Sequence, residues 1–151
     1  MKAVIAPRIR CAHASDLAAI RRLLERAYLP TEDLTSAPGP RFWVLEAGAE
    51  LVGVIGLDRA GPGGLLRSLA VAPAYQGQGI GRALIAQLEH EAQALGIAQL
   101  VLLTETAQAF FDRLGYTVID RRKVPEELKQ SAEFRSLCPA SAVCMTKSVA
   151  P

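Results

Sequence analysis

Three glycines spaced two residues apart mark the segment with the clearest chemical meaning. Gly77, Gly79 and Gly81 follow an apolar stretch that ends at Val71, and they precede a run of helical periodicity. Glycine permits unusual backbone angles and close approach of a ligand, and a helix start offers unpaired N–H groups and the positive end of its dipole. Arg82 would oppose that dipole, so a bound phosphate explains it better than helix stability does. The segment therefore predicts an anion site.

Two well-known phosphate loops fit this segment poorly. A nucleotide P-loop ends in Lys followed by Ser or Thr, and this loop has no such ending. The Gly-x-Gly-x-Gly spacing also misses the third glycine position of a dinucleotide-binding loop. A tight turn without a ligand is the structural alternative, but a strand, a glycine loop and a helix in this order favour a ligand site.

Two charged residues are candidates for work on a second substrate. Glu105 directly follows an apolar strand, where its carboxylate could serve as a base; a solvated position before the next helix is the alternative. Arg67 interrupts an apolar row, because strand alternation is expected to place Leu65, Arg67 and Leu69 on one face. A guanidinium can grip a carboxylate through two hydrogen bonds. An ion pair with an internal acid is the alternative for Arg67.

The cysteines and histidines predict no metal centre. Cys11, Cys138 and Cys144 are an odd number and lack Cys-x-x-Cys spacing, so neither a disulfide framework nor a zinc site is indicated. His13 and His90 lie far apart in the sequence and have no ligand pattern around them.

The elements that must position these residues alternate between strands and helices. Strands are expected at 8–11, 42–47, 50–58, 65–71, 100–104, from 117, and at 142–146. Helices are expected from the N-cap Ser15 to Tyr28, at 79–95 ending at Gly96, at 107–114, and at 125–129. This order predicts an α/β (α+β layered) fold with a mixed central sheet flanked by helices on both faces.

Length, charge and hydropathy narrow the class of protein. The 151 residues are near the usual size of one domain, so a single domain over 1–151 is expected. The net charge of +2 is too small for a protein that binds the nucleic-acid backbone. No apolar run approaches the roughly 20 residues that span a bilayer, and the first residues are too short for a signal-peptide core. We therefore expect a cytoplasmic protein that binds neither nucleic acid nor membrane.

The glycine segment resembles the acetyl-coenzyme A (acetyl-CoA) signature of the GNAT acetyltransferases. The resemblance rests on Gln76-x-x-Gly79-x-Gly81, preceded by Leu69-Ala70-Val71 and followed by an amphipathic helix. It implies the GNAT fold and acetyl-CoA as cosubstrate, with no metal. The cofactor-binding residues that it implies are Leu69, Ala70, Val71, Gln76, Gly77, Gln78, Gly79, Ile80, Gly81, Arg82 and Phe110.

A second resemblance concerns the acceptor. The stretch 102–116, with Val124-Pro125-Glu126-Glu127, is similar to the acetyltransferase domain of bacterial N-acetylglutamate synthases. The tail 134–145, with Leu65-Leu66-Arg67-Ser68-Leu69, resembles the GNAT branch associated with arsenic resistance. Both imply a small amino-acid-like amine as acceptor. We expect Arg67 and Thr104 to bind this acceptor and Glu105 to serve as the base. Cys138 and Cys144 would then either contact trivalent arsenic or serve as small hydrophobic residues.

We assign no residue as the general acid that would protonate the departing thiolate. Many family members have a tyrosine in the short helix where this chain has Phe111, and Tyr116 lies beyond the end of that helix. The leading hypothesis is direct acetyl transfer from acetyl-CoA to a small amine. A non-catalytic sensor of coenzyme A (CoA) and an acetyltransferase for protein or peptide amines are the alternatives. The expected partners are a small-molecule amine and, as one candidate assembly, a second copy of the chain in a homodimer.

Overall fold

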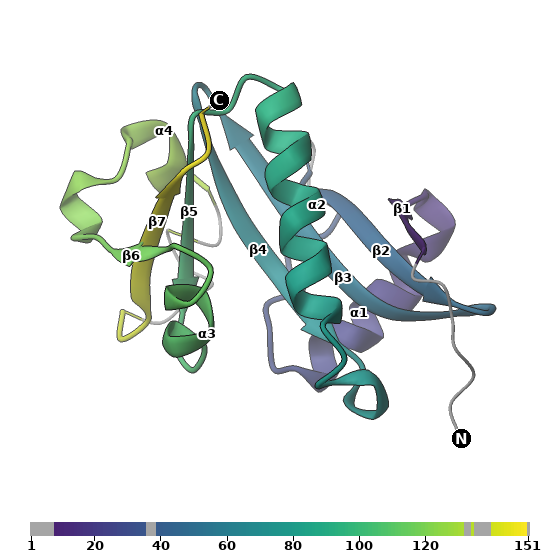
Figure 1. Ribbon diagram of the computed structural model, residues 1–151. Coiled ribbons are helices and arrows are strands. Elements are labelled where there is room, and N and C mark those ends of the chain that lie inside the picture. Colours follow the sequence, from purple (N-terminus) through teal and green to yellow (C-terminus); the bar gives the residue numbers. More distant parts are fainter. Residues whose placement is uncertain (1–7, 36–38, 132–133, 135–139, 151) are drawn as a thin grey trace. The chain divides into compact units, whose positions relative to one another are not determined.

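The computed structural model describes residues 8–35, 39–131, 134 and 140–150, and within them the strands form one seven-stranded mixed sheet in the order β1-β2-β3-β4-β5-β7-β6 (Figure 1). Neighbours β4 and β5 are parallel, whereas the pairs β1–β2, β5–β7 and β6–β7 are antiparallel. The strands are β1 (Arg8–Cys11), β2 (Arg41–Ala47), β3 (Glu50–Ala60), β4 (Gly63–Val71), β5 (Gln99–Thr104), β6 (Thr117–Val118) and β7 (Val143–Ser148). The predicted mixed sheet is confirmed.

The chain divides into two compact units. The first unit holds Met1–Gly56 and Ser68–Leu88, and the second holds Leu57–Arg67 and Glu89–Pro151. Strands β3 and β4 and helix α2 (Ile80–Ala94) contribute residues to both. None of the helices in the described part of the chain is long and apolar enough to cross a membrane.

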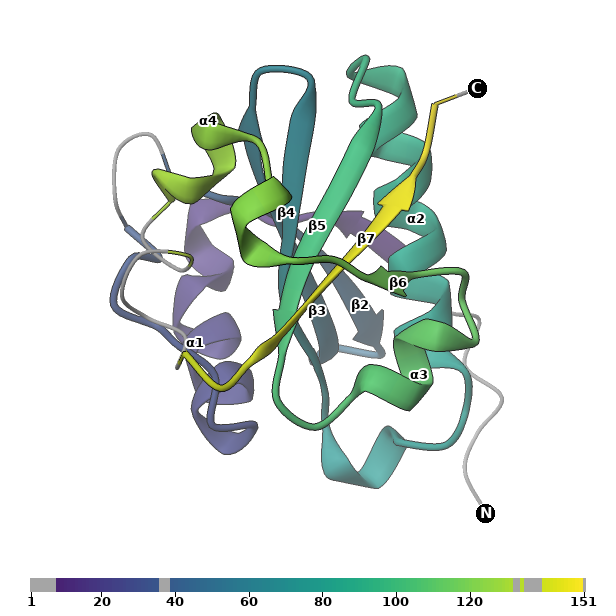
Figure 2. The ribbon, with the colours of Figure 1, turned by 90° about the vertical axis from the view of Figure 1, so that its left-hand side faces the viewer.

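In the first unit, helices cover both faces of the strands. Helix α1 (Leu17–Arg26) buries Ile20, Leu23 and Leu24 on one face, as its apolar spacing predicts. The first part of α2 lies on the opposite face (Figures 1 and 2). A Cβ atom at Gly53 of β3 would lie 2.9 Å from Leu84 Cδ1, so glycine allows this helix to approach the strand closely.

In the second unit, β5 is paired on both sides. Strand β7 pairs with it along its whole length, from Gln99↔Ser148 to Thr104↔Val143. The unit also contains α3 (Gln108–Asp112) and α4 (Glu126–Lys129). Leu128 of α4 packs against Gly63 at the start of β4, where a Cβ atom would lie 3.1 Å from Leu128 Cδ1. One apolar cluster joins the strands to the α4 region; its buried members are Leu65, Val101, Val124, Leu128 and Cys144.

Several element boundaries differ from those expected. Ser15 is not an N-cap, because a 3-10 helix at Ala14–Asp16 precedes α1 and the Asp16 carboxylate accepts from the His13 N–H over 2.6 Å. Helix α1 ends at Arg26, and Tyr28 adopts a φ of +58° beyond it. Strand β4 begins at Gly63 rather than at Leu65, because both glycines after Pro62 pair with β5.

The end of helix α2 agrees with the sequence. Gly96 has a φ of +78°, which a residue with a side chain adopts only at a cost. Its N–H donates to Gln93 O and the Ile97 N–H donates to Ala92 O, so two of the last carbonyls of the helix are satisfied.

Candidate functional site

The glycine loop lies in the first unit, between a 3-10 helix (Pro73–Tyr75) and the start of α2. Gly77 and Gly79 have φ values of +80° and +81°, in the left-handed region. The sequence predicted glycine here for its backbone freedom, and both glycines use it. A Cβ atom at either residue would meet nothing within 4 Å, so open space borders the loop.

Six consecutive backbone N–H groups at this loop have no acceptor among the described residues. The Gln76 N–H donates to Pro73 O, and the Ala83 N–H donates the first helical bond, to Gly79 O. The N–H groups from Gly77 to Arg82 donate to no other part of the described chain. A row of free donors at a helix N-terminus is suited to an anion. Arg82 is exposed in the first helical turn and adds a positive charge there.

The strand that leads to the loop carries a local irregularity. Ser68 has a φ of +58°, which is rare for a residue with a side chain. This conformation interrupts the alternation of side chains, so the expected single row from Leu65 through Arg67 to Leu69 does not hold along β4. Beyond it, Leu69 and Val71 are half-buried and Ala70 is buried. The side-chain amide of Gln76 donates to Val71 O over 3.1 Å.

Arg67 lies in the second unit as a buried charge. Its side chain has no exposed surface, and Nη1 donates to Asp58 Oδ2 over 3.1 Å. The Asp58 side chain is 22% exposed, so the carboxylate reaches solvent while the guanidinium does not. This geometry agrees with the internal ion pair considered for Arg67, and its role in binding an acceptor carboxylate stays a prediction.

The end of β5 holds two further candidate residues. The hydroxyl oxygen of Thr104 accepts from the Ala107 N–H over 3.0 Å, so this side chain fixes the turn that leads to α3. Glu105 lies in this turn, between Thr104 and Ala107, and is exposed. Phe110 is half-buried, and its ring packs edge-on against that of Phe111 with 5.3 Å between the centroids. Phe111 itself is 5% exposed.

Tyr116 belongs to a buried polar network in the second unit. Its hydroxyl donates to Glu89 Oε2 over 2.9 Å, and Lys147 Nζ donates to the same oxygen over 3.0 Å. Burial, together with the nearby Glu89 charge, raises the pKa of the Tyr116 phenol far above its ordinary value. The proton of this phenol is therefore hard to remove.

Of the two cysteines considered as arsenic ligands or small hydrophobic residues, the structure describes Cys144. Cys144 is 3% exposed within the apolar cluster of the second unit, and burial raises the pKa of its thiol to about 11. Cys11 is exposed. Cys138 lies outside the described residues. For Cys144, the geometry agrees with a small hydrophobic residue.

Comparison with known families identifies the fold. The model of the acetyltransferase (GNAT) domain matches residues 38–118, which include β2 to β5 and the glycine loop. The chain belongs to the GNAT acetyltransferase family. A curated relative, an uncharacterized N-acetyltransferase of Chlorobaculum tepidum, is 30% identical over 79 residues, which are 52% of this chain and 48% of that protein. The chain thus matches about half of the length of that relative.

Solved GNAT structures extend the similarity to nearly the whole chain. N-acetylglutamate synthase from Neisseria gonorrhoeae, complexed with CoA and L-arginine, has a TM-score of 0.79 at 24% identity, covering 94% of this chain and 33% of that chain. Rv2747 from Mycobacterium tuberculosis, in complex with CoA and NLQ, has a TM-score of 0.78 at 29% identity, covering 93% of this chain and 98% of that one. The Escherichia coli ribosomal-protein-S18-alanine N-acetyltransferase has a TM-score of 0.74 at 23% identity, covering 97% and 96%.

The candidate residues of this GNAT chain fall into two groups. The loop 76–82 and the strand residues 69–71 belong to the first unit, whereas Arg67, Thr104, Glu105 and Phe110 belong to the second. Sequence reasoning missed Asp58 as the partner of Arg67 and Glu89 as the partner of Tyr116. An acidic residue in the strand before Arg67 was a usable signal for Asp58, but no local signal links positions 89 and 116.

Proposed function

We propose that this GNAT chain transfers an acetyl group from acetyl-CoA to the amine of a small amino-acid-like molecule. The observation that carries the proposal is the row of six free N–H groups from Gly77 to Arg82, next to two left-handed glycines. Such a row offers hydrogen bonds to the oxygens of a pyrophosphate without any side chain. Rv2747, at 29% identity, was crystallised with CoA, which supports the same cosubstrate here.

The chain's own residues supply binding and proton transfer. When bound, acetyl-CoA supplies the acetyl thioester. The loop N–H groups and Arg82 hold the pyrophosphate of acetyl-CoA. The backbone of Leu69 and Val71 pairs with its pantetheine arm. Glu105, exposed after β5, accepts a proton from the acceptor ammonium directly or through water, because only a neutral amine can attack. Attack is direct, without an acyl-enzyme.

No side-chain general acid is needed in this proposal. Phe111 has no ionisable proton. Tyr116 is buried, and its hydroxyl already donates a hydrogen bond to Glu89. A thiolate leaving group has an ordinary pKa of about 8.5, so protonation of the departing thiol by solvent is a modest requirement near neutral pH.

The acceptor class is the finer part of the proposal. The resemblance to N-acetylglutamate synthases supports a small amino acid, with Arg67 and Thr104 on the acceptor side. The resemblance to the arsenic-associated branch supports an arsenical amino acid as one candidate. The S18-alanine acetyltransferase has the same fold and acts on a protein amine, so a peptide acceptor belongs in the same experiment.

A thiol-release assay tests this function. Purified protein is mixed with acetyl-CoA and, in turn, free amino acids, an arsenical amino acid and a peptide with a free α-amine, and CoA thiol is measured together with the mass of the product. We expect acceptor-dependent thiol release and a product heavier by one acetyl group for a free amino acid. Glu105→Gln should lower the rate by roughly 100-fold or more, and Glu126→Gln, another exposed acid, is the control.

Two results would favour the alternatives. Tight CoA binding with no thiol release for any acceptor indicates a sensor. Release that depends on the peptide alone indicates a protein acetyltransferase.

A further inference from the structure

The first unit contains a cavity that takes no part in the proposed reaction. It has a volume of about 660 Å³ and lies between α1, β1 and the β2–β3 hairpin. This volume falls in the range of roughly 300–1,000 Å³ that is usual for small-molecule sites. Half of its twelve lining residues are charged: Arg10, Arg22, Arg26, Asp16, Glu46 and Glu50.

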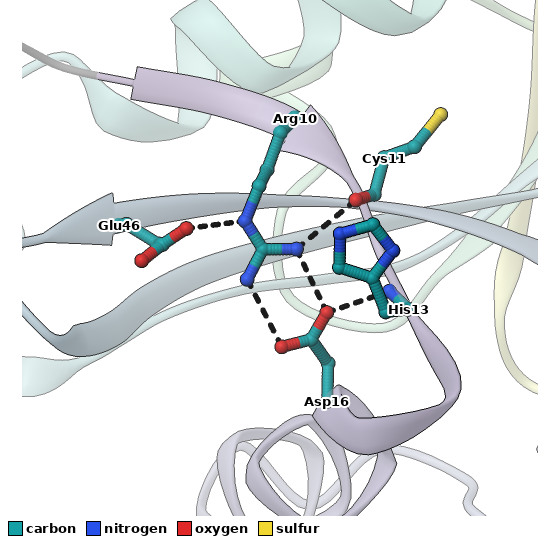
Figure 3. A network of polar contacts seen from close by, with 5 residues as sticks. All are labelled: Arg10, Cys11, His13, Asp16 and Glu46. Atoms are coloured by element: carbon teal, nitrogen blue, oxygen red, sulfur yellow. Dashed lines mark hydrogen bonds and ion pairs between the residues drawn. The ribbon is translucent and has the colours of Figure 1, made fainter.

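One wall of the cavity is a fixed carboxylate cluster. Figure 3 shows Arg10 between Asp16 and Glu46, with the thiol of Cys11 pointing away from them. Asp16 accepts two hydrogen bonds from the guanidinium, over 2.8 and 3.0 Å, and Arg10 Nε donates to Glu46 Oε1. Hydrogen bonds from Arg10 and from the His13 N–H lower the pKa of Asp16 to about 2. Two carboxylates thus share one guanidinium, which leaves this wall with a net negative charge.

Glu46 lines the cavity, and only one of its two carboxylate oxygens is bound to Arg10. Its Oε1 is bound to Arg10, whereas Oε2 accepts no hydrogen bond from any described residue. The Glu46 side chain is 26% exposed and lines the cavity, so a ligand in the cavity can reach it. Because the side chain is anchored through its other oxygen, a ligand's ammonium group could bind to Oε2 with little loss of side-chain entropy.

Two arginines of α1 bring positive charge to the same cavity. Arg22 and Arg26 are one helical turn apart on α1 and both line the cavity. Both are exposed, and neither forms a hydrogen bond or an ion pair with any described residue. Like charges at this spacing repel one another by a few tenths of a kcal/mol. A carboxylate between the two guanidinium groups would remove that repulsion and accept several hydrogen bonds.

The lining of the cavity also includes apolar residues. Ala19 and Leu23 of α1, Leu51 of β3 and Ala72 line the cavity together with the charged groups. We propose that this cavity binds a small zwitterion, a molecule with a carboxylate at one end, an ammonium at the other and an apolar chain between them. The carboxylate lies at Arg22 and Arg26, the ammonium at Glu46, and the chain over Leu23 and Leu51. This inference does not depend on the acetyl-transfer reaction.

Matched probes test the proposal through binding alone. Backbone amide NMR shifts of the full chain, without acetyl-CoA, are followed with ω-amino acids of increasing length, from glycine to ω-aminohexanoate. Alkyl carboxylates and alkylammonium ions of the same lengths carry only one of the two charges. We expect saturable binding of at least one zwitterion, with shifts at α1 and the β2–β3 hairpin, and affinity at least about tenfold weaker for each matched single-charge probe.

Variants show whether the binding is in this cavity. Arg22→Gln and Glu46→Gln should each weaken zwitterion binding about tenfold or more. Arg59→Gln should not change it, because Arg59 is exposed, has no partner among the described residues and does not line the cavity. An amino acid that binds elsewhere, for example as an acetyl acceptor, would keep its affinity in Arg22→Gln and Glu46→Gln. The proposal is wrong if no zwitterion binds up to about 20 mM. It is also wrong if the single-charge probes bind equally well, or if those two variants leave the affinity unchanged.

Discussion

The buried guanidinium of Arg67 donates to the partly exposed carboxylate of Asp58 over 3.1 Å, nine residues earlier in the chain. A charge without exposed surface is costly unless it is paired, and weakening its pairing destabilises the folded state. Arg67 therefore contributes to stability through this pair, whatever it does with an acceptor.

The first prediction separates these two roles of Arg67. Asp58→Asn should lower the free energy of unfolding by roughly 1–3 kcal/mol, because the buried guanidinium loses the negative charge of Asp58, with urea denaturation as the measurement. Exposed Asp112→Asn is the control and should change little. If Arg67 also binds an acceptor carboxylate, Arg67→Lys should raise the acceptor KM beyond any change seen in Asp58→Asn. An Asp58→Asn protein that unfolds at the same urea concentration as wild type would contradict the structural role.

The second prediction concerns Tyr116. Tyr116→Phe should cost roughly 0.5–1.5 kcal/mol of stability, because the hydrogen bond to Glu89 is lost, and should leave the rate of acetyl transfer unchanged. Tyr28→Phe is the matched control, since Tyr28 is 95% exposed. A large fall in kcat with normal stability would assign Tyr116 a catalytic proton instead.

The third prediction concerns Cys144. In a variant with Cys11→Ala and Cys138→Ala, its thiol should react with a thiol reagent at pH 8 about 100-fold more slowly than an unperturbed thiol, because a pKa of about 11 leaves little thiolate. The matched variant that keeps only Cys11, which is exposed, should react much faster. Equal labelling rates would show that Cys144 is accessible and would restore it as a candidate ligand for trivalent arsenic.

The fourth prediction concerns acid stability. The folded-state pKa of Asp16 is about 2, below its ordinary value of 3.8, so its contribution to stability is complete above pH 4 and is lost as the pH falls through 2. Asp16→Asn should thus be less stable than wild type at pH 6, and the difference should shrink progressively between about pH 4 and pH 2. Urea unfolding across this range measures it. A difference that is constant with pH would show that Asp16 does not act through its charge.

The conformation of the glycine loop could be predicted because its properties are local. Left-handed φ values at Gly77 and Gly79 and free N–H groups at a helix start follow from residue type and position alone. The same holds for Gly96 at the end of α2. Element order likewise predicted the mixed sheet, because hydrophobic periodicity is a property of short segments.

The polar partners could not be predicted in the same way. Tyr116, Glu89 and Lys147 come from three distant segments, and their contact depends on packing of the whole second unit. Arg67 was expected to share a face with Leu69, but alternation fails at Ser68, whose left-handed conformation has no signature in residue type. The cavity beside α1 also depends on the placement of Arg10 against Glu46, which lies 36 residues away in the sequence.

Calorimetric titration of CoA into two glycine variants tests the central claim most directly. Gly79→Glu places a carboxylate among the free N–H groups of the loop. Gly96→Glu introduces the same residue at the other end of α2, at nearly the same φ and also in open space, so any backbone strain is matched. If the loop holds the pyrophosphate, Gly79→Glu should lose at least about 100-fold in affinity and Gly96→Glu should bind as wild type does. Undiminished affinity in a folded Gly79→Glu protein would contradict the account.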